Sequence, residues 1–221
     1  MNHRLMAAIL SAAAAFAQGT HPVTGRAIAP VMGMGGADWL ERPERVREEN
    51  PDLAVKLLDI KPGMVLADIG AGVGYYTEKL ARLAGPEGKV YATEIQPGML
   101  ARLKKRMNAA GLANYEAVLS PRGGTGLPDG SIDLALLVDV YHEFDQPQLM
   151  LALIRQALKA DGRLVLIEFR KEDSWIPIRE EHKMTVTEAK RELEAEGFKL
   201  QKAISDRLPW QHILIFRKNV Q

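Results

Sequence analysis

Hydrophobic and polar positions follow two alternating patterns from residue 51 onward. Continuous apolar runs are typical of strands covered on both faces, and apolar residues every three or four positions are typical of amphipathic helices. Runs that we expect to form strands lie at 64–70, 89–95, 115–120, 131–140, 163–170, 198–208 and 211–218. Runs that we expect to form helices lie at 51–60, 76–85, 97–111, 146–162 and 185–197.

This alternation predicts an α/β fold with a doubly wound, mostly parallel sheet. The last two strand segments are joined by a short loop around Pro209, which leaves no room for the crossover that parallel pairing requires. We therefore expect them to form an antiparallel hairpin. Residues 51–221 would make one domain with a large core, and residues 18–50 an N-terminal extension with too few apolar residues for a core of its own.

The first 17 residues have the pattern of a secretory signal peptide. Arg4 supplies a positive charge, residues 5–14 are apolar apart from Ser11, and residues 15–17 match the small-x-small cleavage pattern. We expect cleavage after Ala17 and export to the periplasm, or a cytoplasmic location where the leader is not used. An amphipathic or disordered extension is the alternative. No segment beyond the leader is long and apolar enough in sequence to span a membrane.

Charge and cysteine content narrow the classes of function. The chain has 29 Lys and Arg against 28 Asp and Glu, so its net charge of +1 gives no electrostatic argument for nucleic acid or an anionic membrane. A basic cluster at 102–107 is typical of a solvated helix face. The absence of cysteine excludes disulfides, a thiolate nucleophile and cysteine metal sites.

A glycine-rich turn follows the first predicted strand. Ligands of doubly wound sheets bind outside the carboxyl ends of the strands. Gly70, Gly72 and Gly74 let the backbone approach a ligand there, beside the start of the next helix. The second strand ends at Glu94, twenty residues after Gly74, where a carboxylate can accept hydrogen bonds from two ribose hydroxyls. Both features fit either NAD or S-adenosylmethionine (SAM).

The spacing of this turn favours SAM. A dinucleotide fingerprint reads G-x-G-x-x-G, whereas here the third glycine comes one residue early and Tyr75 stands where the dinucleotide glycine would be. Asp68 precedes the first glycine by two residues. A carboxylate would repel a pyrophosphate, but it attracts the ammonium or sulfonium end of a cationic ligand.

The stretches ADIGAGVGYYT (67–77) and YATEI (91–95) resemble the first two motifs of the class I SAM-dependent methyltransferases, and the closing hairpin also resembles that fold. The similarity runs from about residue 51 to 218. It implies a Rossmann-like seven-stranded sheet of order 3-2-1-4-5-7-6 with strand 7 antiparallel. The resemblance is nearest to leader-bearing bacterial members that act on small molecules.

The resemblance also implies contacts with the cofactor. Asp68 would lie near the methionine amino group of SAM, and the three glycines would line the methionine and the ribose. Glu94 would hold the ribose, with Ile95 and Gln96 beside the adenine. The alternative for Asp68 is a local cap of the turn, and the alternative for Gly74 is close packing of helix on sheet.

Two further positions follow the third and fourth strands. Asp139 matches the acidic residue of the family's fourth motif, with a local helix cap as the alternative. Residues 120–125 (SPRGGT) depart from the family, which often places an acidic or amide residue there near the adenine amine. Ser120 is the remaining candidate for that contact.

The stretch DVYHEF follows the fourth strand, where this fold usually receives the methyl acceptor. His142 is the candidate base, since its reference pKa lies near neutrality, and Glu143 and Tyr141 are further candidates. The alternative is that His142 bonds the backbone and Tyr141 packs. His142, Glu143, Glu168 and His182 lack a ligand spacing such as H-x-x-x-H, so we expect no metal.

These observations predict a SAM-dependent methyltransferase acting on a small-molecule acceptor, with no nucleic-acid partner. The alternatives are a non-catalytic SAM-binding protein, an NAD(P)-dependent oxidoreductase, and methylation of RNA or protein. Within residues 18–50, glycine hinges and Trp39 are compatible with a lid over the reactants, or with a strap packed on the sheet edge.

Overall fold

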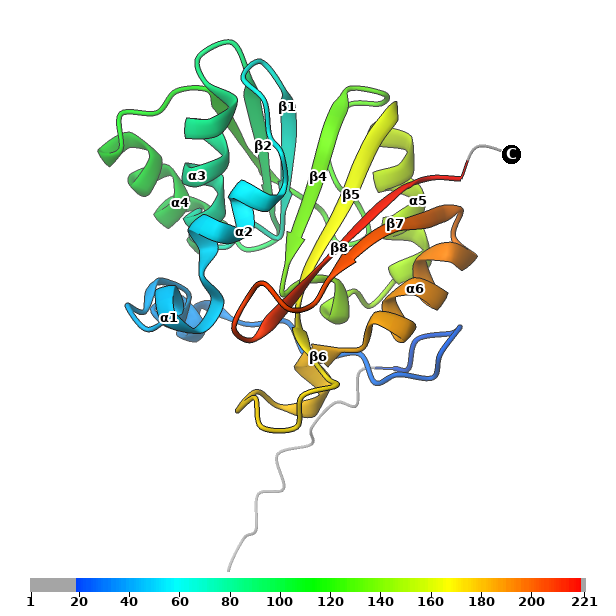
Figure 1. Ribbon diagram of the computed structural model, residues 1–221. Coiled ribbons are helices and arrows are strands. Elements are labelled where there is room, and N and C mark those ends of the chain that lie inside the picture. Colours follow the sequence, from blue (N-terminus) through cyan, green and yellow to red (C-terminus); the bar gives the residue numbers. More distant parts are fainter. Residues whose placement is uncertain (1–18, 220–221) are drawn as a thin grey trace, which may run out of the picture.

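The computed structural model describes residues 19–219 and shows a twisted sheet with helices on both faces (Figure 1). The predicted leader, residues 1–17, lies outside the described residues. The strands are β1 Val65–Ile69, β2 Lys89–Glu94, β3 Tyr115–Leu119, β4 Ile132–Val138, β5 Leu158–Arg170, β6 Lys183–Met184, β7 Phe198–Ile204 and β8 Gln211–Lys218.

The order of the sheet agrees with the prediction. Seven strands run β3-β2-β1-β4-β5-β8-β7, and β8 is antiparallel to both β5 and β7. This is the expected order 3-2-1-4-5-7-6 once the additional strand β6 is counted. That two-residue strand was not predicted; it pairs with Phe169 and Arg170 at the end of β5. It brings the loop 171–182 back beside the end of the sheet.

Two hydrophobic cores lie on the two faces of the sheet. Leu66 and Leu134 face the core shared with α2 Pro51–Leu57, α3 Tyr75–Ala84 and α4 Pro97–Ala109. Ala67 and Leu137 face the core shared with α5 Pro147–Ala157 and α6 Val186–Ala195. Each lies an odd number of positions from its counterpart in the first core, so its side chain points to the other face of the sheet. Because both faces are covered, the central strands carry mostly apolar residues on both sides, which explains their long hydrophobic runs.

The helix expected over 146–162 ends at Ala157, so its predicted end was wrong. Leu158 has extended backbone angles and begins β5, where it pairs with Ile132 of β4. Gly162 lies so close to β4 that an added Cβ would stand 2.7 Å from the carbonyl oxygen of Ile132. This glycine therefore permits close strand contact, and it does not end a helix.

The N-terminal extension packs in two parts. In the first, the buried Arg26 binds Glu192 of α6 through two contacts of 3.1 Å, and Ala29 N–H donates to the carbonyl of His142 at 3.0 Å. The second part contains η1 Met34–Gly36, η2 Trp39–Glu41 and α1 Arg45–Glu49, and runs below the lower end of the sheet in Figure 1. The first part is thus a strap that is anchored to α6 and to the loop after β4.

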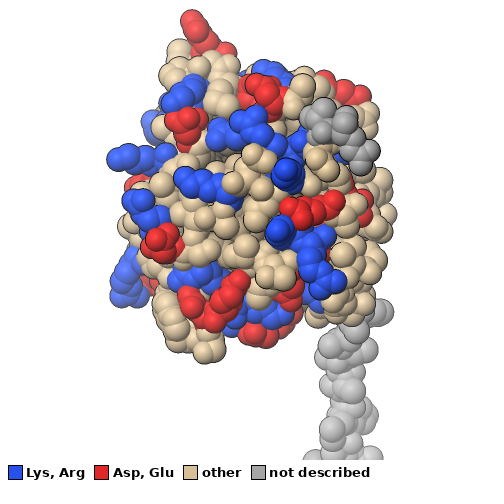
Figure 2. Space-filling model, turned by 45° about the vertical axis from the view of Figure 1, so that its right-hand side comes forward, with Lys and Arg blue, Asp and Glu red and all other residues tan. Residues whose placement is uncertain are grey.

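Acidic and basic side chains are interspersed on the face shown in Figure 2, in keeping with the balanced composition. Within residues 19–219, none of the helices combines the length and the apolar character needed to cross a bilayer.

Candidate cofactor and acceptor site

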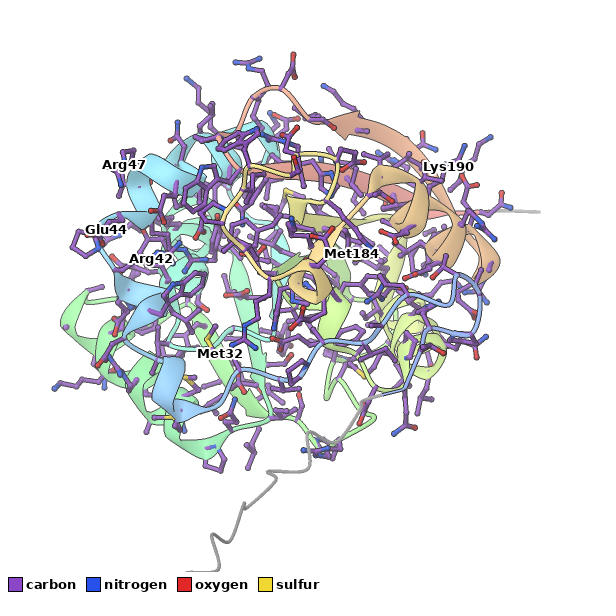
Figure 3. The ribbon with its side chains drawn as sticks, turned by 90° about the horizontal axis from the view of Figure 1, so that it is seen from below. Met32, Arg42, Glu44, Arg47, Met184 and Lys190 are labelled. Atoms are coloured by element: carbon purple, nitrogen blue, oxygen red, sulfur yellow. The ribbon has the colours of Figure 1, made fainter. Side chains whose placement is uncertain are left out.

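A cavity lies beyond the carboxyl ends of β1, β2 and β4. Gly70 and Gly72 from the loop after β1, Glu94 at the end of β2 and Asp139 after β4 all line it. Residues of the N-terminal extension, including Met32 and Trp39, also line it. Figure 3 views the molecule from that end of the sheet, and the segment that carries Met32 crosses in front of the strand ends. The position is the one at which doubly wound sheets bind ligands.

The glycine loop approaches its surroundings closely. Gly70 has φ +71°, its N–H donates to the carbonyl of Thr93 at 2.9 Å, and an added Cβ would stand 2.7 Å from both Val140 methyl groups. Gly72 has φ +54°, and its Cβ would stand 2.9 Å from Leu40. Both positions require glycine, because residues with a Cβ rarely adopt these φ angles and the added Cβ would clash with Val140 or Leu40.

Glu94 is fixed in the wall by backbone donors. Its Oε2 accepts from Gly72 N–H at 3.0 Å and its Oε1 accepts from Gln96 N–H at 2.9 Å. Each carboxylate oxygen keeps a lone pair for a ligand hydroxyl. Ile95 also lines the cavity, and the Gln96 side chain lines it while donating to the Met32 carbonyl at 2.8 Å. The predicted residues of the second motif therefore all meet at one wall.

Asp68 and Gly74 lie behind this wall and do not line the cavity. Asp68 is buried and accepts from Thr77 Oγ1 at 2.6 Å. Burial raises the pKa of Asp68 to about 6, against the Thr77 hydrogen bond and the charge of Arg45, which lower it. Gly74, at φ +82°, precedes α3 and packs on Leu103. Asp68 can thus act on a ligand through its charge, and Gly74 positions the helix.

Asp139 lines the cavity in a left-handed backbone conformation, φ +53°. Its Oδ2 accepts from Gln211 Nε2 at 2.7 Å, while its buried Oδ1 has no hydrogen-bond partner within residues 19–219. Burial, with the negative charges of Glu49 and Glu168 adding to it, raises the pKa of Asp139 well above its ordinary value. An unpaired buried oxygen at a cavity wall is suited to a polar group of a ligand.

Arg45 is a further cavity residue, and its sequence pattern does not indicate this position. It is buried at the wall, pairs with Glu49 at 2.6 Å, donates to the Leu40 carbonyl at 2.9 Å and lies over the Tyr75 ring. In sequence, an arginine four residues before a glutamate resembles a solvated surface pair. Nothing local distinguished it from such a pair. Ser120 also lines the cavity, and its hydroxyl donates to the Thr125 carbonyl at 3.1 Å.

The three acceptor-side candidates form one short 3-10 helix, η3 Tyr141–Glu143, but point in different directions. Only Glu143 lines the cavity. Tyr141 is buried with its hydroxyl 3.2 Å from His21 Nε2, which is a packing role. His142 is buried between two partners: Glu168 Oε2 lies 2.6 Å from its Nδ1, and His182 Nδ1 lies 3.1 Å from its Nε2.

Glu143 connects the acceptor loop to the N-terminal extension. Its Oε1 accepts from Met32 N–H at 3.3 Å and lies 3.9 Å from His182 Nδ1. Burial raises the pKa of Glu143 to about 7, while His142 and the Met32 hydrogen bond lower it. The structure therefore brings together His142, Glu143, Glu168 and His182, whose sequence spacing predicted no common site.

Comparisons with known proteins agree with this geometry. Residues 67–166 match the family described as "Methyltransferase domain". The ubiquinone/menaquinone biosynthesis C-methyltransferase of Burkholderia cenocepacia is 29% identical over 121 residues, covering 55% of this chain and 49% of that protein. Its counterpart from Teredinibacter turnerae is 30% identical over 118 residues, covering 53% and 47%. The chain thus spans about half the length of these curated relatives.

Solved structures share the fold over a longer span. A SAM-dependent methyltransferase from Aquifex aeolicus superposes with a TM-score of 0.79 at 24% identity, covering 84% of this chain and 98% of that one. The mitomycin 7-O-methyltransferase MmcR gives a TM-score of 0.59 at 21% identity, covering 70% and 49%. The sheet order, the glycine loop with Glu94 and the family match agree. Residues 67–166 are thus a methyltransferase domain, and together with the fold they support a class I SAM-dependent methyltransferase.

Proposed function

We propose that this protein transfers the methyl group of SAM to a small-molecule acceptor. The observation that carries the proposal is one cavity whose wall holds both the cofactor-side residues Gly70, Gly72 and Glu94 and the acceptor-side residues Val140, Glu143 and Phe144. A cofactor held by the first group would present its reactive end to a molecule held by the second.

The residues present fit SAM. Glu94 has two oriented oxygens for ribose hydroxyls, and Gly70 and Gly72 present bare backbone at the cavity wall. Asp139 offers an unpaired oxygen, and Asp68 adds negative charge behind the loop. SAM supplies an electrophilic methyl group on a sulfonium. The protein's task is then chiefly to align the acceptor and to exclude water.

The acceptor we propose is apolar and carries one polar atom. The cavity wall includes six apolar side chains, so much of its surface is hydrophobic: Met32, Trp39, Leu40, Val140, Phe144 and Met150. Glu143 supplies a polar contact there. The curated relatives are named for ubiquinone and menaquinone biosynthesis, and one structural neighbour for mitomycin, which supports an apolar ring compound as the acceptor class.

Calorimetric titration with SAM tests the cofactor site. Glu94→Ala removes a carboxylate whose hydrogen bonds to ligand hydroxyls contribute about 1.5–3 kcal/mol each, so SAM affinity should fall at least about tenfold. Glu116→Ala, an exposed substitution on β3 of the same sheet, should leave affinity unchanged. Asp68→Ala should also weaken binding. Unchanged affinity in both Asp68→Ala and Glu94→Ala would contradict the proposal.

Two further measurements separate the alternatives. A thermal-shift comparison of SAM, S-adenosylhomocysteine and NADH distinguishes the methyltransferase from an NAD(P)-dependent oxidoreductase, because only the true cofactor class stabilises the folded chain. Labelled SAM incubated with a metabolite extract distinguishes an enzyme from a non-catalytic SAM-binding protein. Transfer of label to a small molecule is the expected result.

We also propose export through the predicted leader. The support is the sequence pattern of residues 1–17 alone. Cell fractionation followed by N-terminal sequencing tests it. A protein that begins at Gln18 outside the cytoplasm is expected, whereas a full-length cytoplasmic protein retaining Met1 would refute it.

A further inference from the structure

We infer that His142, Glu143 and His182 form a binding site for one divalent transition-metal ion of the zinc class, beside the proposed acceptor end of the cavity. Each of the three offers one ligand atom, and these atoms all lie within 4.8 Å of one another. Two imidazoles and one carboxylate are a ligand set that Zn²⁺ and its first-row neighbours prefer. Mg²⁺ and Ca²⁺ prefer sites made of oxygen ligands.

The separations suit a common ion. Ligand atoms about 2.0–2.1 Å from a tetrahedral zinc lie about 3.3 Å apart. His142 Nε2 and His182 Nδ1 are 3.1 Å apart, and His182 Nδ1 and Glu143 Oε1 are 3.9 Å apart. The two imidazole rings stand nearly perpendicular, at 83°, with these nitrogens facing each other. All three ligand atoms lie within 4.8 Å of one another, so side-chain shifts of about an ångström would bring them to a common ion.

Glu168 is the independent observation that supports the site. It is fully buried, accepts from Tyr141 N–H at 3.0 Å through Oε1, and lies 2.6 Å from His142 Nδ1 through Oε2. A carboxylate in this position holds the proton on Nδ1 and directs the lone pair of Nε2 toward His182. Metal-binding histidines commonly have such a carboxylate on their second nitrogen. Glu168 is therefore a positioning residue, which orients His142 without touching the ion.

The fold assembles this set from separate elements. His142 and Glu143 come from η3 after β4, Glu168 comes from β5, and His182 ends η4 Glu180–His182 just before β6. The pairing of β6 with β5 holds the loop of His182 against η3. This explains why no metal-binding spacing is visible in the sequence.

The position of the site suggests its ligand. Three protein ligands leave at least one coordination position of a zinc-class ion open. Since Glu143 lines the cavity, an oxygen atom of the acceptor is the group this open position would take. That last step rests on the proposed function, whereas metal binding itself does not.

Zinc titration of the untagged full chain, after treatment with a chelator and without SAM, tests the inference. One Zn²⁺ per chain should bind. His182→Ala and Glu143→Gln should each weaken binding at least about tenfold, and Glu168→Gln should weaken it about tenfold to a hundredfold with all three ligands retained. Glu181→Gln, the neighbour of His182 outside the ligand set, should bind like the wild type.

Circular dichroism establishes that each variant is folded. Co²⁺ bound to the wild-type chain supplies a readout that needs no variant, because its visible ligand-field bands report nitrogen and oxygen ligands in a four- or five-coordinate site. Absence of saturable Zn²⁺ binding, or equal affinity in His182→Ala and Glu181→Gln, would overturn the inference. A chain that binds Zn²⁺ here but does not bind SAM would overturn the proposed function alone. A chain that binds SAM but does not bind Zn²⁺ would overturn the metal site alone.

Discussion

Asp68→Asn separates the charge of this buried residue from its hydrogen bond. The amide oxygen of asparagine still accepts from Thr77 Oγ1, which now bonds the carboxylate at 2.6 Å. What is lost is a negative charge that burial makes unfavourable. We therefore expect the variant to be more stable than the wild type at neutral and alkaline pH, and less able to bind SAM, whose cationic end the charge would attract.

The magnitude follows from linkage between protonation and folding. Burial raises the pKa of Asp68 from 3.8 to about 6, and each pKa unit corresponds to 1.36 kcal/mol, which gives about 3 kcal/mol. A raised acid pKa stabilises the folded state fully below pH 3.8, and this stabilisation is lost as pH rises through about 6. The gain from Asp68→Asn should thus be near zero in acid and approach about 3 kcal/mol above pH 6.

Urea unfolding of the SAM-free chain, followed by circular dichroism at about pH 4.5 and about pH 8, measures this difference. Asp206→Asn, an exposed substitution, is the control and should change stability little at either pH. A variant less stable than the wild type at about pH 8, or a stability difference equal at both pH values, would refute the reasoning.

Three further predictions concern the same site and its supports. Gly70 has φ +71°, and an added Cβ would stand 2.7 Å from the Val140 methyl groups, so Gly70→Ala should lower stability by about 1–3 kcal/mol and weaken SAM binding. Gly130→Ala, at φ +58° in open space, is the control and should show only the cost of the backbone strain in denaturant melts. Arg45→Met leaves the buried Glu49 without one of its partners and should lower the free energy of unfolding by about 3–5 kcal/mol. The double variant Arg45→Met with Glu49→Gln should recover much of that stability, and an equally unstable double variant would contradict this reasoning. Thr185→Ala removes the capping box of α6 and should cost about 0.5–2 kcal/mol in thermal or urea unfolding, while Thr187→Ala, on the exposed side, should cost little.

Short sequence patterns predicted the fold well, because strand burial and loop length are both visible in neighbouring residues. Continuous apolar runs marked the strands that both helical layers cover, and the short connection at Pro209 required the antiparallel hairpin of β7 and β8. The error at Gly162 arose where a long-range contact with β4 determined the backbone, which periodicity cannot report. β6 is too short to have a pattern of its own.

The site was predictable only where its residues are close in sequence. The glycine loop and Glu94 are neighbouring parts of one β-α-β unit, so their spacing is informative. His142 meets Glu168 and His182 across 26 and 40 residues of chain, and the cavity wall includes Met32, which is bonded to Gln96 across 64 residues. Contacts of this kind are made by the sheet and the strap, and no short window contains them.

The strap has a consequence for the order in which the site can be built. Arg26 reaches its partner Glu192 across 166 residues, so a segment synthesised early is secured by one of the last helices to leave the ribosome. Until α6 has formed, the segment that precedes Met32 lacks its buried ion pair, although the strands that carry Gly70 and Glu94 already exist. Such long-range closure slows folding. A chain truncated before α6 would keep the whole matched segment 67–166 and still lack a complete site.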